Sequence, residues 1–383
     1  MTNASEIRQV PATQLKAELD DGRELFILDL RNPDEFARWQ VGGKEPVPTL
    51  NIPYFNFLED EEGNIARLPR DREITLLCAK GGASEYVASL LQERGIAARN
   101  VAGGMQAWAV LYAAKPVVEA ESFTLLQFDR VAKGCLSYLL ASGGEALVVD
   151  PGRHVEQYIA AAAARGLTVA GVVDTHVHAD HISGGADLAA RAGCPYYIAD
   201  GDMLGAPLAH IELKDGARLR VGDTVVEVLA ISTPGHTPGS SSLLVDDRYL
   251  LSGDTVFVES VGRPDLGGQA TQWARDLFGT LYARLGAVKD DVLVLPAHYS
   301  SPTEIRAGGL IAERLGRIRA DNAAFHLGDE AAFVAQILAD LPVQPAAYDT
   351  MRLVNRGEYP VDEDQAFELE IGANQCAAKH HGS

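Results

Sequence analysis

The sequence has few cysteines and no long apolar segment. The four cysteines, Cys78, Cys135, Cys194 and Cys376, are far apart and form no CxxC pair. This spacing excludes a disulfide framework and is typical of a reducing compartment. No run of ~20 uncharged apolar residues is present, and the opening MTNASEIRQV has neither a basic start nor an apolar stretch. We therefore expect a cytoplasmic protein without a membrane span or a secretion signal.

Positive charge is also scarce. Lys and Arg number 33 against 53 Asp and Glu, which gives a formal net charge of −20. Such a chain repels phosphate backbones and anionic lipid surfaces. We expect small-molecule partners and neither nucleic acid nor membrane, and an anionic substrate would need a local cation.

The length of 383 residues exceeds what one hydrophobic core usually fills, so two domains are expected. Residues 24–95 alternate apolar strands with amphipathic helices, which predicts a parallel α/β sheet. Beyond a Pro-bearing stretch, strands come in two runs, each followed by helices, as in an α/β/β/α sandwich. The predicted class is α/β, with domains over residues 1–115 and 122–383 and a linker at 116–121.

Cys78 stands at the end of an apolar strand in the first domain. The following residues, 79–84, form a short Gly-containing turn that leads into a helix. Backbone N–H groups of such a turn and the helix N-terminus stabilise a thiolate and lower its pKa. Lys80 adds a cation. The alternative is a buried structural cysteine.

Three segments carry a resemblance in this domain: LDLRNPDEFARWQVGG, ITLLCAKGGAS and VAGGMQAW. In order and spacing they resemble the landmarks of a rhodanese domain over residues 5–113. The resemblance implies that Cys78 accepts a sulfane sulfur as a persulfide and passes it to a nucleophile. The loop lacks the arginines that many members use to bind thiosulfate, with only Lys80 basic, so thiosulfate, persulfide and sulfite stay open as reactants.

A second cluster consists of residues that bind metals. The segment THVHADHISGG follows an apolar strand and places four such residues within six positions, and three more follow later strands. Imidazole and carboxylate together suit Zn, Fe or Mn. The seven are His176, His178, Asp180, His181, His236, Asp254 and His298.

This pattern resembles the metallo-β-lactamase superfamily from about residue 122 to at least residue 300. The resemblance implies the sandwich fold and leaves two chemistries open. In one, two zinc ions bridged by Asp254 activate a hydroxide against a thioester, as in the glyoxalase II family. In the other, His176, His236 and Asp254 hold one ferrous ion, and three positions stay open for oxygen and a sulfur substrate. The remaining members, His178, Asp180, His181 and His298, would then orient the ligands.

Three features favour the second chemistry. The motif HVHADH resembles the corresponding motif of the persulfide dioxygenases. Residues 262–266 (GRPDL) resemble the segment that follows the bridging aspartate in that family. In this segment Arg263 would form an ion pair with an anionic persulfide, unless it pairs with Asp265. A sulfurtransferase fused to an enzyme that oxidises persulfide also makes chemical sense. One departure is Tyr299, which stands after His298 where the family usually has Asp.

The resemblance therefore predicts a sulfur dioxygenase of hydrogen sulfide metabolism. It would hold one Fe(II) per chain and oxidise glutathione persulfide or a similar persulfide with O2, giving sulfite and thiol. Cys78 would exchange sulfur between thiosulfate, persulfide and sulfite. The alternative is a dinuclear zinc, glyoxalase II-like hydrolase with a rhodanese accessory domain. The family also allows a homodimer.

Overall fold

The computed structural model describes residues 7–222, 226–339 and 341–378. This part of the chain contains two compact units. The first comprises residues 7–113 with the short segments 130–133 and 371–373, and the second comprises 114–129, 134–370 and the residues from 374 onward. Each unit has its own sheet or sheets and its own hydrophobic core.

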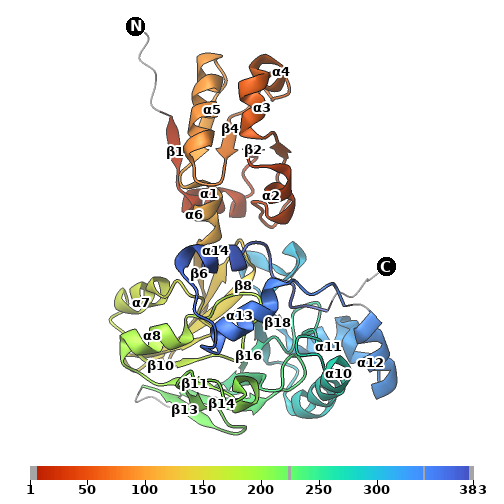
Figure 1. Ribbon diagram of the computed structural model, residues 1–383. Coiled ribbons are helices and arrows are strands. Elements are labelled where there is room, and N and C mark those ends of the chain that lie inside the picture. Colours follow the sequence, from red (N-terminus) through yellow and green to blue (C-terminus); the bar gives the residue numbers. More distant parts are fainter. Residues whose placement is uncertain (1–6, 223–225, 340, 379–383) are drawn as a thin grey trace. The chain divides into compact units, whose positions relative to one another are not determined.

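The first unit is built on a parallel sheet, as predicted. Its strands lie in the order β1-β5-β4-β2-β3, and each neighbouring pair is parallel (Figure 1). They are β1 (Arg8–Val10), β2 (Phe26–Asp29), β3 (Thr49–Asn51), β4 (Ile74–Leu77) and β5 (Ala98–Val101). All four residues of β4 are buried, as expected for the central strand of a parallel sheet.

Six helices accompany this sheet in the described part of the unit. They are α1 (Ala12–Asp20), α2 (Pro33–Arg38), α3 (Tyr54–Glu59), α4 (Glu61–Ile65), α5 (Gly82–Glu93) and α6 (Gly104–Ala109). The apolar side of α5, with Val87 and Leu91, packs in one core with Leu28 of β2 and Leu76 of β4. This packing fixes the turn between β4 and α5, which contains Cys78.

The second unit contains two sheets. The first has the order β12-β11-β10-β9-β8-β7-β6 and the second the order β13-β14-β15-β16-β17-β18 (Figure 1). The first sheet consists of β6 (Tyr112–Glu119), β7 (Thr124–Arg130), β8 (Cys135–Ser142), β9 (Glu145–Val149), β10 (Thr168–Val173), β11 (Tyr196–Ile198) and β12 (Ile211–Glu212). The second consists of β13 (Arg218–Val221), β14 (Val226–Ser232), β15 (Ser241–Val245), β16 (Tyr249–Gly253), β17 (Leu293–Pro296) and β18 (Glu313–Arg314).

One core joins the two sheets. It includes Leu140 and Val149 from the first sheet and Val228, Leu243 and Leu295 from the second. Helices cover the outer sides: α7 (Glu156–Ala163) and α8 (Gly185–Ala192) pack on β10, and α10 (Ala270–Gly279) and α12 (Glu330–Ala339) pack in a further core with β16 and β17. This is the predicted sandwich of two sheets between helices.

Further helices follow the last strands of the second unit. They are α11 (Leu315–Asp321), α13 (Ala347–Asn355) and α14 (Glu363–Leu369), and a shorter helix, α9 (Asp200–Met203), precedes β12. Helix α13 contributes Tyr348 and Met351 to a core that also contains Trp273 and Cys376. The C-terminal part of the chain therefore packs against the sandwich.

The stretch expected as a linker differs from the prediction. Residues 116–119 belong to β6, the edge strand of the seven-stranded sheet. An edge strand tolerates Pro116 because one side of its backbone has no partner in the sheet. Pro116 therefore lies in an edge strand of the sheet. The domain limits at 115 and 122 stay a prediction.

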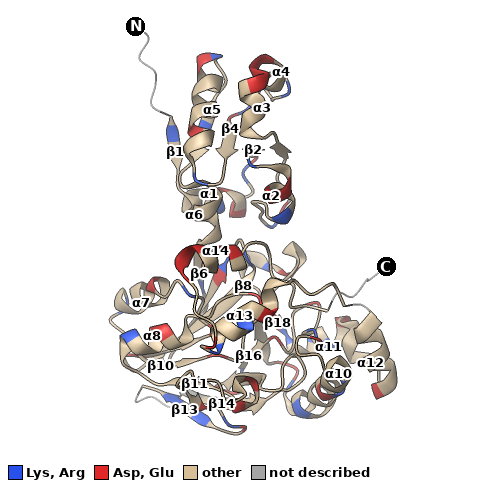
Figure 2. Cartoon of the chain, viewed as in Figure 1, with Lys and Arg blue, Asp and Glu red and all other residues tan. Residues whose placement is uncertain are grey.

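Acidic side chains are spread over the helices of both units, for example on α4 and α14, and basic ones lie among them (Figure 2). Among the described residues, no helix is both long and apolar enough to cross a membrane.

Candidate functional site

Cys78 lies where β4 ends and the turn into α5 begins. Its side chain is 6% exposed, and two donors point at the sulfur: the Gly81 N–H at 3.0 Å and the Ser84 hydroxyl at 3.1 Å. Both donors stabilise a thiolate more than a thiol. Lys80, the expected loop cation, is exposed. The turn into α5 thus directs two donors at the Cys78 sulfur.

Close backbone packing fixes this turn from the side of α6. The Met105 N–H donates to the Cys78 carbonyl at 2.8 Å. A Cβ at Gly104 would lie 2.2 Å from that same carbonyl oxygen, and Gly104 has a φ of +57°. Only glycine fits such an approach. The GGM segment therefore serves to hold the cysteine turn in place.

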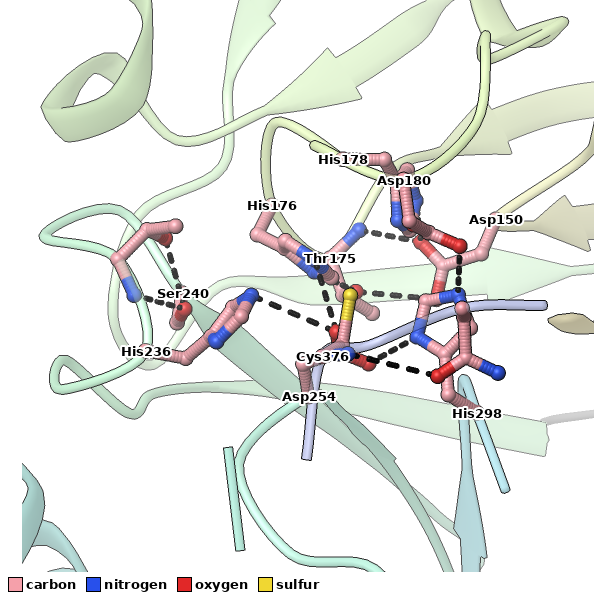
Figure 3. A network of polar contacts seen from close by, with 12 residues as sticks. Asp150, Thr175, His176, His178, Asp180, His236, Ser240, Asp254, His298 and Cys376 are labelled. Atoms are coloured by element: carbon pink, nitrogen blue, oxygen red, sulfur yellow. Dashed lines mark hydrogen bonds and ion pairs between the residues drawn. The ribbon is translucent and has the colours of Figure 1, made fainter. Parts of the chain in front are cut away.

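The predicted metal-binding residues all follow strands of the second unit. The HVHADH segment comes after β10, His236 after β14, Asp254 directly after β16 and His298 after β17. Strand ends thereby bring residues far apart in sequence into one buried cluster, drawn in Figure 3. Loops carried on a rigid scaffold commonly form sites in this way.

His176, His236 and Asp254 form a set within that cluster. Their ligand atoms all lie within 4.8 Å of one another. The Nε2 atoms of His176 and His236 lie 3.6 and 3.4 Å from the same Asp254 oxygen, Oδ2. All three atoms are buried without a hydrogen-bond partner. Buried polar atoms are rarely left unpaired, so this set fits a bound cation.

The tautomers of both histidines suit metal binding through Nε2. The Thr175 hydroxyl donates to Asp150 at 2.9 Å, so its oxygen accepts from Nδ1–H of His176 at 3.0 Å. His236 donates its Nδ1–H to the Arg263 carbonyl at 2.9 Å. Each Nε2 therefore keeps its lone pair and points at Asp254 (Figure 3). Burial also lowers the pKa of His236 to about 4, whereas at His176 the effect of burial is outweighed by Asp254, which raises the pKa of that ring.

His178 points elsewhere. Its Nε2 lies 3.2 Å from Asp150 Oδ1, and its ligand group contains Asp150 and Asp174 rather than Asp254. Burial holds the pKa of His178 well below its usual value. Asp150 also accepts the Thr175 N–H at 2.7 Å and has a φ of 51°, a conformation that Asp tolerates better than most residues. This aspartate thus orients both His178 and the loop that carries His176.

His298 lies between two carboxylates. Its Nδ1 is 2.5 Å from Asp254 Oδ1 and its Nε2 is 3.1 Å from Asp180 Oδ2. Burial opposes the charged ring, but Asp180 and Asp254 raise the pKa of His298 well above its usual value. Only Nδ1 forms a hydrogen bond, and Nε2 has no hydrogen-bond partner, as is also true of His181 Nε2.

Two cysteines that the sequence did not single out border this half of the cluster. Cys135 Sγ lies 3.1 Å from Asp180 Oδ2 and forms a ligand group with Asp180, His181 and His298. Cys376 forms another with Asp254 and His298. No sequence signal places Cys376 here, because its neighbours AAK and NQ resemble no motif.

Arg263 has contacts other than the expected substrate. Its guanidinium pairs with both oxygens of Asp265 at 2.7 and 2.8 Å and donates to the carbonyls of Gln375 and Pro342. The side chain is fully buried. Pairing with Asp265 was the alternative reading of this residue. We therefore assign Arg263 to the wall of the site and not to a persulfide.

The GRPDL segment passes close to the ligands because of its glycine. A Cβ at Gly262 would lie 1.9 Å from the Asp254 carbonyl oxygen and 3.0 Å from the His236 Cβ. A side chain here would displace the segment that carries Arg263. Gly262 therefore lets the backbone carbonyl of Arg263 reach His236.

Helix α13 fixes the HVHADH loop. The side-chain amide of Asn355 donates to the carbonyls of His178 and His181, both at 2.8 Å, and accepts from the Ser183 N–H at 2.9 Å. Glu370 accepts from the Ile182 N–H at 2.9 Å. The chain after α12 thus supports the loop that carries four of the seven residues.

A cavity of about 210 Å³ lies along the loops that carry His176 and His236. It is lined by Val177 from the HVHADH loop, Thr237 and Pro238 next to His236, and Arg352 from α13, among others. The Arg352 Nε is buried without a hydrogen-bond partner, although one of its terminal nitrogens pairs with Asp349. None of the seven candidate ligands lines this cavity, and its wall also contains the carboxylate of Asp202.

Comparison with known proteins agrees with this architecture. The Metallo-beta-lactamase superfamily pattern matches residues 130–298, and the Rhodanese-like domain pattern matches residues 11–111. A hydroxyacylglutathione hydrolase of Anaeromyxobacter dehalogenans is 34% identical over 206 residues, which cover 51% of this chain and 77% of the relative.

Two solved structures are similar to the chain. A metallo-beta-lactamase from Staphylococcus aureus is 28% identical with a TM-score of 0.58, and covers 63% of this chain and 75% of its own. The structure of ETHE1 from Myxococcus xanthus is 25% identical with a TM-score of 0.52, and covers 64% of this chain and 100% of its own. The chain therefore belongs to the metallo-beta-lactamase superfamily and carries a rhodanese-like domain ahead of that fold.

Proposed function

We propose that the protein is an iron-dependent persulfide dioxygenase of the cytoplasm, coupled to sulfur transfer at Cys78. The substrate is a low-molecular-weight persulfide such as glutathione persulfide. One persulfide, one dioxygen and one water give sulfite, a thiol and two protons. The metal is one Fe(II), held by His176, His236 and Asp254.

One observation carries this proposal: His176 Nε2, His236 Nε2 and Asp254 Oδ2 converge as buried atoms without hydrogen-bond partners. Two histidines and one carboxylate, with the other coordination positions open, are the typical ligand set of non-heme Fe(II) oxygenases. The second oxygen of Asp254, Oδ1, is bonded to His298 Nδ1, so the oxygen left for a metal is the one that faces His176 and His236. In the other half, His181 Nε2 and His298 Nε2 are also without partners.

Bound iron supplies the redox chemistry that lets dioxygen oxidise the terminal sulfur. The chain's own residues position the ligands and the substrate. Asp150 and Thr175 hold His176 in the Nε2-binding tautomer, and the Arg263 carbonyl does the same for His236. We place the thiol carrier in the cavity beside Val177 and Pro238, where Arg352 can pair with one of its carboxylates.

In the first unit, Cys78 transfers sulfane sulfur. Its thiolate attacks the outer sulfur of a thiosulfate or a persulfide, the S–S bond breaks, and sulfite or thiolate leaves with the electron pair. The Gly81 N–H and the Ser84 hydroxyl stabilise the anionic sulfur before and after the transfer. The same steps in reverse deliver the sulfur to sulfite or to a thiol, so this unit either supplies the persulfide or consumes the sulfite.

A dinuclear hydrolase is the second candidate. Asp180, His181, His298 and Cys135 also lie close enough together to hold an ion, and Asp254 borders both halves. The similar protein from Anaeromyxobacter dehalogenans is named as a hydrolase of hydroxyacylglutathione. Two zinc ions would then activate a hydroxide against an acyl-glutathione thioester.

Metal content and oxygen uptake distinguish these functions when measured on one anaerobically purified sample. After Fe(II) loading, we expect about one iron per chain and oxygen uptake that depends on glutathione persulfide. Asp254→Ala should abolish both, whereas Cys78→Ser should leave the oxygen uptake and remove sulfur transfer. Two zinc ions, no uptake and hydrolysis of an acyl-glutathione would refute the dioxygenase in favour of the hydrolase.

A further inference from the structure

Asp202 is a buried carboxylate in α9 that is not one of the seven candidate ligands. Three donors bind it. The Val177 N–H at 2.9 Å and the Thr237 hydroxyl at 2.7 Å share its Oδ2 atom, and the Gly239 N–H lies 2.6 Å from Oδ1. A buried carboxylate needs such donors, and the charge makes these hydrogen bonds strong. Asp202 therefore holds all three groups in place.

The donors come from the two loops that carry the histidines of the triad. Val177 follows His176 directly, after β10 of the first sheet, and Thr237 follows His236 directly, after β14 of the second sheet. Because these strands belong to different sheets, strand pairing does not set the distance between the two loops. The Asp202 carboxylate connects them across the end of the sandwich.

A second link joins the same parts of the chain on the other side of His176. The Ser241 N–H donates to the Thr175 carbonyl at 2.8 Å. His176 thus stands in the chain between two points at which its loop is tied to the segment of His236. With both links in place the loop cannot turn about either one, so the direction of the His176 side chain is fixed.

The approach of Asp202 depends on Gly239. A Cβ at Gly239 would lie 2.7 Å from both the backbone nitrogen and the Cγ atom of Asp202. Only glycine lets the carboxylate come this close to the turn. Within the turn, the Thr237 N–H donates to the Ser240 hydroxyl at 3.1 Å. Asp202 therefore contacts a turn whose own hydrogen bonds fix the backbone next to His236.

We infer that Asp202 is a positioning residue of the metal triad. It ties the loop of His176 to the loop of His236 and thereby sets the distance and the angle between their Nε2 atoms. The inference rests on the proposed metal centre of His176, His236 and Asp254. Asp202 does not touch the metal and acts through the backbone of the two loops. Its loss should weaken and distort metal binding without abolishing it, because Asp254 is carried by β16 and stays in place.

Cobalt(II) is a suitable probe, because its visible d–d bands change with the arrangement of its ligands. The full-length protein, metal-free and under anaerobic conditions, is titrated with Co(II) in competition with a chelator of known affinity. Asp202→Asn keeps the size of the side chain and turns an amide NH2 towards at least one of the three donors. We expect Co(II) binding to weaken by about tenfold, and the d–d bands at saturation to differ from those of the unaltered protein.

The matched control is Asp200→Asn, on the same helix. Asp200 is exposed and its carboxylate pairs with His210 at 2.8 Å, so this variant should keep both the affinity and the bands. Thr237→Val removes one of the three bonds to Asp202 and should weaken Co(II) binding by about threefold. Thr237→Ser keeps the hydroxyl and should bind Co(II) as the unaltered protein does.

Two results for Asp202→Asn would overturn the inference. One is an unchanged affinity with unchanged d–d bands. The other is a loss of affinity and of metal-free thermal stability with unchanged bands, as a purely structural residue would give. Should this variant fail to fold, equal Co(II) affinities of Thr237→Val and Thr237→Ser overturn it. If His176→Ala and Asp254→Asn both bind Co(II) as tightly as the unaltered protein, the proposed metal centre is wrong instead.

Discussion

Thr175 makes a sharp test of the proposed metal centre, although it binds no metal itself. Its hydroxyl donates to Asp150 and accepts from His176 Nδ1, at 2.9 and 3.0 Å. Thr175→Val keeps the volume and removes both bonds. The imidazole of His176 then loses the group that fixes its tautomer and ring orientation.

We expect this change to weaken Fe(II) binding by about 10- to 100-fold, the range found when a partner of a metal-binding histidine is removed. That corresponds to about 1.4 to 2.7 kcal/mol of binding free energy. The loss should not be total, because His236 keeps its bond to the Arg263 carbonyl and Asp254 stays in place. The matched variant Thr175→Ser keeps a hydroxyl and should bind iron within a few-fold of the unaltered protein.

Anaerobic Fe(II) titration against a chelator of known affinity measures both variants. Thermal unfolding of the metal-free proteins shows whether the valine has damaged the fold. If Thr175→Val binds Fe(II) as tightly as the unaltered protein while its metal-free stability is unchanged, the orientation of His176 through Thr175 plays no part and the reasoning fails.

Three further changes test other parts of the molecule. Ser84→Ala removes one of the two donors to Cys78. The anionic sulfur should lose about 1.4 kcal/mol of transition-state stabilisation, which would slow thiosulfate formation from sulfite and glutathione persulfide by about tenfold. Arg352→Met should raise KM for glutathione persulfide by about tenfold and leave kcat unchanged, in steady-state oxygen uptake. Arg99 lowers the pKa of Glu18 from 4.5 to about 2. This pair therefore stabilises the fold fully above the unfolded pKa and less as pH falls towards 2. Glu18→Gln should cost on the order of 1 kcal/mol at pH 7 in denaturant unfolding, because solvent screens part of the interaction, and close to nothing near pH 2.

The sequence predicted the α/β class and its sheets because these depend on local pattern. The apolar run ITLL forms the buried strand β4, and the Gly-containing turn after Cys78 leads into α5 as expected. The histidines and aspartates follow strands, so the sandwich brings them together. The stretch around Pro116 was expected to be a linker, because it contains a proline and has no clear alternation of apolar and polar residues. An edge strand can have the same sequence features.

Other features of the site depend on contacts that local sequence does not carry. From the sequence, Arg263 was expected to be a cation free to bind substrate near Asp254. In the fold, its guanidinium donates hydrogen bonds to Asp265 and to the carbonyl of Gln375. Cys376 lies far along the chain from the motifs and reaches the cluster only through those contacts. Asn355 likewise stands in a plain helical sequence and holds the HVHADH loop by tertiary hydrogen bonds.

The C-terminal part of the chain therefore packs directly against the site. The seven metal-binding positions come from strand ends of the sandwich, and the same positions serve one metal or two in this superfamily. Here the HVHADH loop is fixed by Asn355 and Glu370, and the wall over Asp254 is formed by Cys376 with its anchor Arg263. Since those residues determine which side chains surround Asp254, we expect the choice between the two chemistries to follow this segment more closely than the motif itself.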